Sequence, residues 1–527
     1  MTALAVEKLD LRIGSNVVLC DVSFTLDAGE TLGLVGESGS GKSMLALAIM
    51  GLLPPAAIAT GSVRLDDVEL IGAPEGVLNR LRGNDLAMVF QEPMTALNPL
   101  MTVGAQVGET LRLHGVRDDG ERVRAALDRV GLEAVSQNRY PHELSGGQRQ
   151  RVVIAMATVL SPRVLLADEP TTALDVLVQR RVLDLLQSLA REERTGLLMI
   201  SHDLAVVAER ADRLLVLREG RIVEHGRTRD VLRAPKHGYT RALARASAHV
   251  PERPHRVVGA APLLEARDLV KDYRLPRKGL FGGRARLRAV DGASLTIGRG
   301  EAVGLVGGSG CGKSTLARMV LGLEPITAGT VRFDGAAVDP TDMQAVRRRM
   351  QVVFQDPSGS FDPRHRVHRI VAEPLHLVPD LAASERRERA AAALAEVGLE
   401  ADTLDRYPHQ FSGGQRQRIA IARALVVRPE LVIADEPVSA LDVSTRAQVL
   451  DLFADLQTRL GLATLFITHD LAVVRAVCDR VYVMDAGTMV EQGPVDRVFR
   501  SPEHATTRAL LEAAPNLDAI RGRWDDA

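Results

Sequence analysis

The chain has 527 residues with 66 basic and 67 acidic side chains, a balance that argues against a generally basic nucleic-acid binder. Its three cysteines, Cys20, Cys311 and Cys478, form no CxxC pair, so no zinc or iron–sulfur framework is visible and a reducing compartment is favoured. No apolar run approaches the roughly twenty residues of a membrane-spanning helix, and the first residues lack a signal-peptide pattern. We therefore expect a globular chain that does not cross a membrane alone.

The first strong pattern is a strand, a glycine-rich turn and a helix. Thr31–Val35 is predicted as a strand, and Gly36–Ser43 (GESGSGKS) matches the P-loop pattern GxxxxGK[ST] before a helix that opens near Lys42. In such a loop the backbone N–H groups wrap phosphates, the lysine meets the β- and γ-phosphates, and the final Ser43 suits Mg²⁺. The predicted nucleotide-binding residues are Gly36, Glu37, Ser38, Gly39, Ser40, Gly41, Lys42 and Ser43.

Polar side chains that suit nucleotide hydrolysis follow three later strands. Asp168 is suited to Mg²⁺, and Glu169 to a general base that polarises the attacking water. Gln91 can bring its amide oxygen to Mg²⁺ or to that water, and His202 can hydrogen-bond a γ-phosphate. The strands predicted to carry these side chains at their ends are Leu86–Phe90, Val164–Ala167 and Leu197–Ile200.

The alternation of strands and helices predicts the fold class. Short apolar strands separated by helix-like stretches favour an α/β domain with a mainly parallel sheet. Gln106–Val130 and Leu381–Val397 are rich in Ala, Arg, Leu and Glu and are predicted to be helical. Each lies between two motifs of its half, which suggests a separate helical subdomain.

The motifs occur twice, which indicates two copies of one domain. The spacing between copies is 271 residues from Gly36 to Gly307, and 267 residues from Arg139 to Arg406. We predict a first domain at 1–250, a Pro-rich linker at 251–262 and a second domain at 263–527. The second set of site residues is Gly307, Gly308, Ser309, Gly310, Cys311, Gly312, Lys313, Ser314, Gln355, Asp435, Glu436 and His469.

One further repeated motif has no single-site explanation. LSGGQRQR at Leu144–Arg151 recurs as FSGGQRQR at Phe411–Arg418. Ser and two Gly opening a helix form an anion cradle, yet the P-loop already holds the phosphate. Here the chain closely resembles the ATP-binding-cassette (ABC) family, whose signature motif is LSGGQ. The resemblance covers essentially the whole chain and implies that each domain has a P-loop NTPase core, a helical subdomain and an antiparallel β subdomain.

The resemblance implies that the two domains pack head to tail, with each ATP between one P-loop and the opposite signature. Asp175 and Asp442 match the D-loop that crosses this interface. Both sites keep full catalytic sets, so both are expected to hydrolyse ATP with Mg²⁺. The first P-loop would face Ser412, Gly413, Gly414 and Gln415, and the second would face Ser145, Gly146, Gly147 and Gln148. The metal-binding residues would be Ser43, Gln91, Asp168, Ser314, Gln355 and Asp435.

Two positions depart from the family pattern. Phe411 replaces the usual signature leucine, an apolar change of little expected consequence. The family usually stacks an aromatic ring on adenine, and Tyr273 fits that role in the second half, whereas Ile13 takes the matching place in the first half. Loss of the ring would weaken adenine binding at the first site by about 1 kcal/mol.

Details outside the catalytic motifs resemble the peptide and nickel importer subfamily. The Q-loop segments Phe90–Pro99 and Phe354–Arg364 and the tails Ala234–Ala246 and Ser501–Pro515 carry this resemblance. It implies an ATPase on the cytoplasmic face of the membrane that drives two permease subunits, with an extracytoplasmic solute-binding protein and a cargo that does not bind this chain directly. Peptides are the leading cargo; nickel, glutathione and other small solutes remain alternatives. Without a cysteine-rich tail, no iron–sulfur cluster is expected.

Other classes of protein fit the sequence less well. A soluble tandem cassette protein acting on ribosomes or DNA would carry a long charged linker or zinc modules, and neither is visible. A binding module without hydrolysis conflicts with Glu169 and Glu436. Adenylate-kinase-like phosphotransfer would need an acceptor pocket or lid pattern, which the sequence does not show.

Overall fold

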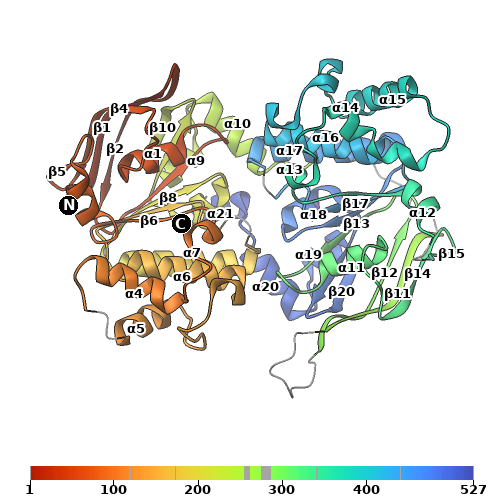
Figure 1. Cartoon of the computed structure of the whole chain (residues 1–527), viewed down its shortest axis with the longest axis horizontal. Helices are drawn as coiled ribbons and strands as arrows, with labels where there is room; N and C mark the ends of the chain where they lie inside the picture. Colours follow the sequence, from red (N-terminus) through yellow and green to blue (C-terminus); the bar gives the residue numbers. More distant parts are fainter. Residues whose placement is uncertain are drawn as a thin grey trace.

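Each half of the chain contains an antiparallel sheet and a mainly parallel sheet (Figure 1). The computed structural model describes residues 2–117, 120–171, 174–253, 261–274, 286–339, 342–439 and 441–525. In the first half the antiparallel sheet has the order β2 (Asn16–Asp27), β1 (Thr2–Ile13), β4 (Ala57–Leu65), β5 (Val68–Glu69). The parallel sheet has the order β10 (Arg221–Arg227), β9 (Arg213–Arg218), β3 (Thr31–Val35), β8 (Gly196–Ser201), β7 (Val164–Asp168), β6 (Leu86–Val89), with β10 antiparallel to β9.

The second half repeats this arrangement. Its antiparallel sheet has the order β12 (Arg286–Gly298), β11 (Pro262–Arg274), β14 (Ala328–Phe333), β15 (Ala336–Ala337). Its parallel sheet has the order β16 (Met350–Val353), β17 (Leu431–Asp435), β18 (Ala463–Ile467), β13 (Ala302–Val306), β19 (Arg480–Asp485), β20 (Thr488–Pro494). The predicted α/β class and the tandem duplication are confirmed. Residues 254–260 of the predicted linker lie outside the described residues, so the domain boundaries stay a prediction.

Helices cover the sheets and build a helical subdomain in each half. The subdomains contain α3 (Pro93–Ala96), α4 (Val103–Leu113), α5 (Glu121–Arg129) and α6 (Gly146–Thr158), and α13 (Pro357–Ser360), α14 (Val367–Val371), α15 (Ala383–Glu396) and α16 (Gly413–Leu425). The other helices of the first half are α1 (Lys42–Ile49), α2 (Glu75–Leu81), α7 (Val176–Glu193), α8 (Leu204–Arg210), α9 (Thr228–Arg233) and α10 (Gly238–Ser247). Those of the second half are α11 (Lys313–Val320), α12 (Gln344–Arg349), α17 (Val443–Leu460), α18 (Leu471–Val477), α19 (Val495–Arg500), α20 (Ala505–Ala513) and α21 (Leu517–Asp525).

One predicted helix is wrong in its extent. The stretch Gln106–Val130 is two helices, because α4 ends at Leu113 and α5 begins at Glu121. Gly115 adopts a left-handed conformation (φ 70°), which an α-helix does not accommodate. The corresponding prediction in the second half, Leu381–Val397, is confirmed by α15.

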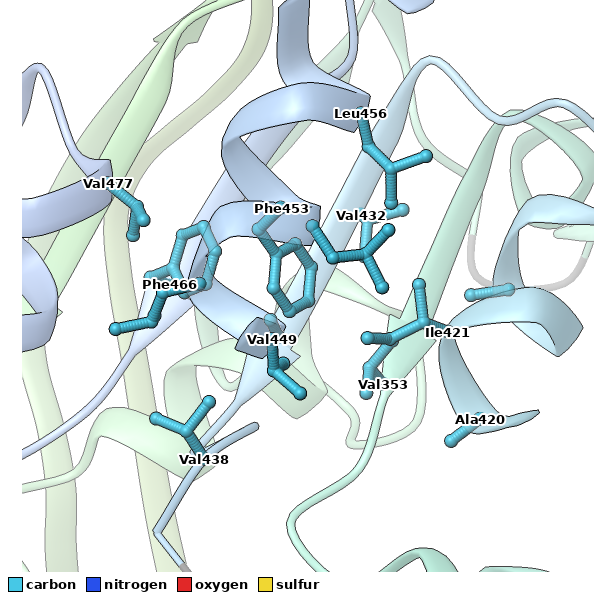
Figure 2. Packing of buried hydrophobic residues seen from close by; sticks show 14 of the residues in the cluster. Val353, Ala420, Ile421, Val432, Val438, Val449, Phe453, Leu456, Phe466 and Val477 are labelled. Atoms are coloured by element: carbon cyan, nitrogen blue, oxygen red, sulfur yellow. The ribbon is translucent and has the colours of Figure 1, made fainter. Parts of the chain in front are cut away.

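The core of the second half shows why α17 forms where it does. Asp442 caps the helix by accepting from the Thr445 N–H, and Gly461 ends it in a left-handed conformation. Its apolar residues recur at helical spacing and pack on the parallel sheet (Figure 2). Phe453 meets Phe466 of β18 edge to face, with ring centroids 4.9 Å apart.

The two halves are joined through the helices that follow each cassette core. Helix α10 of the first half packs on α17, and α20 of the second half packs on α7. Helix α21 lies among elements of the first half (Figure 1). It packs against α8 and α9, where the Arg521 guanidinium donates to the Leu232 carbonyl at 2.8 Å. Within the described ranges, no helix is long and apolar enough to cross a membrane.

Candidate functional site

The predicted strand, turn and helix of the first P-loop are confirmed. Gly41 precedes α1 with φ 104°, and a Cβ there would lie 2.8 Å from Leu19 Cδ2, so the turn requires glycine. Lys42 is buried, and its ammonium donates to the carbonyls of Gly36 (2.7 Å) and Glu37 (2.8 Å). Burial lowers the pKa of Lys42, and the neighbouring carboxylates of Glu169 and Asp168 oppose that shift.

The second P-loop has the same geometry. The Lys313 ammonium donates to the carbonyls of Gly307 (2.8 Å) and Gly308 (2.9 Å). Cys311 stands where the first loop has Ser40, and its sulfur lies 3.8 Å from Lys313 Nζ. In both halves the lysine holds the backbone of its own loop and is placed to exchange these carbonyls for phosphate oxygens.

The aspartates at the ends of β7 and β17 have the character of metal ligands. Burial raises the pKa of Asp168, opposed by a hydrogen bond from Ser43. Asp168 Oδ1 is buried and has no hydrogen-bond partner in the described part of the chain. In the second half, Asp435 stands in the same relation to Ser314, and burial again raises its pKa. A buried carboxylate oxygen without a partner, beside a serine hydroxyl, fits Mg²⁺ bound directly or through water.

The glutamate after each aspartate is held between a glutamine and a histidine. Gln91 Nε2 donates to Glu169 Oε2 at 2.9 Å, and His202 Nδ1 lies 3.2 Å from Glu169 Oε1. The second half repeats this: Gln355 Nε2 donates to Glu436 Oε2 at 2.8 Å, and His469 Nδ1 lies 3.0 Å from Glu436 Oε1. The ends of three neighbouring strands thus bring together side chains that lie far apart in the sequence.

Both glutamates occupy a strained backbone conformation. Glu169 has φ 46° and Glu436 has φ 48°, a left-handed region that costs a residue with a side chain about 1–2 kcal/mol. Each amide is fixed by the end of the neighbouring strand, since Glu169 N donates to the Ile200 carbonyl at 3.0 Å and Glu436 N to the Ile467 carbonyl at 2.8 Å. The same conformation therefore recurs at the equivalent position of both copies.

A hydrogen bond joins the halves at the second P-loop. The Ser309 amide donates to Asp175 Oδ2 at 3.0 Å, and the other oxygen of Asp175 accepts from the Leu177 and Val178 amides at the start of α7. The second P-loop therefore faces the first half. A cavity of about 380 Å³ lies between the halves and is lined by residues of both, including His202 and His469.

Comparisons with known proteins show the family of the chain. A family model described as ABC transporter matches residues 19–172 and 290–439, more than half of the chain. The chain belongs to the ABC transporter family. A second model, the oligopeptide/dipeptide transporter C-terminal region, matches residues 223–268 and 490–526. The chain is an ABC ATPase of the fused tandem form, and ATP hydrolysis by this family is coupled to transport.

Similar proteins span nearly the whole chain. The peptidoglycan transport ATP-binding protein YejF of Agrobacterium fabrum is 46% identical over 518 residues, covering 96% of this chain and 94% of that protein. The glutathione import ATP-binding protein GsiA of Escherichia coli (strain K12) is 43% identical over 568 residues, covering 99% and 90%. A solved structure of cbiO1 from Clostridium perfringens is 31% identical and covers 46% of this chain and 91% of its own, with a TM-score of 0.40.

The ABC signature residues open α6 and α16. The hydroxyls of Ser145 and Ser412 each accept from the amide three residues on, and the Gln148 and Gln415 side chains complete capping boxes. A Cβ at Gly147 would lie 2.4 Å from Val178 Cγ1, so glycine allows α6 to approach α7. The signature glycines form the first turns of these helices: Gly146 and Gly147 in α6, and Gly413 and Gly414 in α16.

The pairing of each ABC signature with the opposite P-loop stays a prediction. Across the residues that the structure describes, no hydrogen bond joins Ser145 or Ser412 to a P-loop.

Phe411 is buried like Leu144, with the Arg406 guanidinium 4.3 Å from its ring centroid.

The strand register relates the two adenine-side positions of the ABC sites. Ile13 pairs with Asn16 at the end of β1, and Tyr273 pairs with Leu287 at the corresponding end of β11. The two residues occupy equivalent places, and both are half-buried. The Lys271 ammonium lies 5.0 Å from the Tyr273 ring centroid.

The sequence analysis missed one contact of the first P-loop. The Glu37 amide donates to the Tyr239 hydroxyl at 2.9 Å, across 202 positions of the chain. The available signal was a difference between the copies: Tyr239 stands in HGYT of the first tail, where the second tail reads HATT with Thr506.

Glu436 and His469 form an ion pair, and each shifts the pKa of the other. Burial by itself would raise the pKa of Glu436, but the hydrogen bond and charge of His469 lower it overall. Burial by itself would lower the pKa of His469, but Glu436 raises it overall. The carboxylate therefore stays ionised, as a general base requires.

Replacing His469 with glutamine is expected to remove a pH-dependent stabilisation. The contribution of Glu436 is present above its ordinary pKa of 4.5 and is lost as pH falls through its lower folded value. The contribution of His469 is present below its ordinary pKa of 6.5 and is lost as pH rises through its higher folded value. The difference in thermal unfolding midpoint between the wild type and the variant should therefore be largest between pH 4.5 and 6.5.

The measurement is a series of thermal unfolding curves from pH 4 to 9. His376→Gln is the matched control, because His376 is exposed and its ring lies within hydrogen-bond distance of the Glu373 backbone carbonyl. It should show no such window. A wild-type advantage over His469→Gln that does not vary with pH would contradict the ion pair.

Proposed function

We propose that this chain powers the import of di- or oligopeptides through two permease subunits. The observation that carries the proposal is the match to the oligopeptide/dipeptide transporter C-terminal region, which occurs behind each cassette core. The related proteins support an importer, since their names refer to peptidoglycan transport and to glutathione import. The chain would act at the cytoplasmic face of the membrane, with an extracytoplasmic solute-binding protein delivering the cargo.

Glutathione is the second candidate cargo. The relative named for glutathione import covers 99% of this chain at 43% identity. Glutathione is itself a small peptide, so both cargoes are consistent with the same permease chemistry. Nickel and other small solutes have no comparable observation in their favour.

We infer two composite ATP sites, each built from both halves. Lys42 and Lys313 would exchange their backbone carbonyls for the β- and γ-phosphates. When bound, Mg²⁺ neutralises phosphate charge, and the residues that would hold it are Ser43, Gln91 and Asp168 in the first site and Ser314, Gln355 and Asp435 in the second. The hydrogen bond from Ser309 to Asp175 supports this arrangement, because it places the D-loop of one half on the P-loop of the other.

The catalytic step would use the glutamate and histidine of each site. Glu169 or Glu436 would take a proton from the attacking water, and the contact with His202 or His469 would orient that carboxylate. Gln91 and Gln355 contact the same glutamates and begin the segments that lead into the helical subdomains. Loss of the γ-phosphate would therefore change the contacts at the start of each helical subdomain. That change would move a permease.

Uptake by cells with the gene deleted tests the cargo. Cells would be given radiolabelled tripeptide, glutathione or Ni²⁺ after complementation with the wild-type chain or with Glu169→Gln/Glu436→Gln. Tripeptide uptake restored by the wild type alone supports the proposal. Restoration of only glutathione or only nickel uptake would replace the peptide assignment. Normal uptake of all three in the deletion strain, with no membrane protein co-purifying, would contradict an importer.

A further inference from the structure

The two P-loops are held by different contacts. In the first, the Glu37 amide donates at 2.9 Å to Tyr239, which belongs to α10 of the same half. In the second, the Ser309 amide donates at 3.0 Å to Asp175, which belongs to the opposite half. The tyrosine thus belongs to the same half as the loop that it contacts, whereas the aspartate belongs to the half opposite its loop.

Among the described residues Asp442 does not repeat the contact of Asp175, and the surroundings of the two aspartates differ at one side chain. Thr445 follows Asp442 by three positions, and its hydroxyl donates to Asp442 Oδ2 at 3.0 Å. The first half has Val178 at that position, which has no hydroxyl, and there Asp175 Oδ2 accepts from the Ser309 amide. The charge of Asp442 still lies close enough to raise the pKa of Lys42 against the effect of burial.

The tyrosine contact likewise has no counterpart in the second half. Thr506 takes the place of Tyr239, and its hydroxyl donates to Asp485 Oδ2 at 2.7 Å. In the described portion of the molecule, no hydrogen bond links Thr506 to the second P-loop. The two differences are complementary: the loop that lacks the aspartate contact has the tyrosine.

The surroundings of Tyr239 hold its hydroxyl in place. The residue is 7% exposed, and the Arg218 guanidinium lies 5.1 Å from its ring centroid. Its ring belongs to a hydrophobic cluster that contains Leu243 of α10 and Val443 of the opposite half. Burial raises the pKa of Tyr239 to about 12, so the hydroxyl remains protonated at neutral pH.

We propose that Tyr239 is a positioning residue for the first ATP site, where its hydroxyl fixes the Glu37 amide in place of the contact that Asp175 makes at the second site. The inference rests on ATP binding by Gly36–Ser43. Because α10 also packs on α17, a shift of the second half would reach the first P-loop through Tyr239. The C-terminal extension therefore takes part in nucleotide binding at one site and not at the other.

Site-resolved photolabelling tests the proposal in the full-length chain. Tyr239→Phe removes the hydroxyl and keeps the ring. The probe is 8-azido-ATP with Mg²⁺, and mass spectrometry assigns the label to residues 1–253 or 261–527. Because Tyr239→Phe loses one hydrogen bond, the probe concentration that half-saturates labelling of the first half should rise about two- to tenfold. Labelling of the second half should not change.

Thr506→Val is the matched control, because it removes the hydroxyl at the equivalent position. It should leave the labelling of both halves unchanged. The proposal is overturned if Tyr239→Phe leaves first-half labelling as in the wild type, or weakens both halves equally with a lower thermal unfolding midpoint. Lys42→Ala distinguishes the failure of the Tyr239 proposal from the failure of ATP binding by the first P-loop. If Lys42→Ala also leaves first-half labelling intact, the first P-loop does not bind ATP.

Discussion

Replacing Glu169 and Glu436 together by glutamine is expected to lower steady-state ATP hydrolysis by about 10²–10⁴-fold. The amide has nearly the size of the carboxylate but cannot accept the proton of the attacking water. Each glutamate lies within hydrogen-bond distance of a glutamine and a histidine in the structure, so the substitution changes the chemistry without removing the side chain. Steady-state phosphate release is the measurement.

ATP binding should survive in the same double variant. Lys42 and Lys313 are unchanged, so the halves should close around unhydrolysed nucleotide and stay closed. Glu109→Gln/Glu388→Gln is the control, because both residues are exposed on the helical subdomains. Phosphate release at close to the wild-type rate in Glu169→Gln/Glu436→Gln would remove both glutamates from the catalytic step.

Lys42→Ala and Lys313→Ala are each expected to weaken ATP binding at their own site by about ten- to a hundredfold. Hydrogen bonds to charged groups contribute about 1.5–3 kcal/mol, and each ammonium is positioned to make them with phosphate oxygens. Both lysines are buried and now hold the carbonyls of their own loops, so they need only exchange acceptors. Equilibrium binding of labelled ATP is the measurement.

Lys236→Ala controls for the loss of one positive charge. Lys236 is exposed and lies outside both P-loops, so ATP affinity should match the wild type. If Lys42→Ala and Lys313→Ala also bound ATP like the wild type, Gly36–Ser43 and Gly307–Ser314 would not be nucleotide-binding loops.

The proximity of the proposed catalytic side chains could be predicted because each motif is a local pattern at the end of a strand. Thr31–Val35 was predicted with the bounds of β3, and the helix after the P-loop begins at Lys42 as expected. In a parallel sheet the carboxyl ends of neighbouring strands share one edge, so Gln91, Glu169 and His202 had to meet once the strands were known. Repetition of the set at a near-constant spacing made chance an insufficient explanation.

Other features depend on packing between distant residues and left little trace in the sequence. Residue type alone does not favour the left-handed backbone of Glu169 and Glu436. Hydrogen bonds to the neighbouring strand hold this conformation. The break after Leu113 reflects a turn at Gly115 inside a stretch of good helix formers. Local propensity is a weak guide wherever tertiary contacts decide the conformation.

Two copies of a P-loop cassette, and the residues proposed to bind nucleotide, could be inferred from local patterns, since strands, turns and caps are encoded within a few neighbouring positions. The assembled fold adds the contacts that the residues differing between the copies make. Tyr239 reaches the first P-loop, and Asp175 reaches the second, because α10 and α7 are placed by packing against elements hundreds of residues away. Such contacts depend on the shape of the assembled surfaces, which no short stretch of sequence specifies.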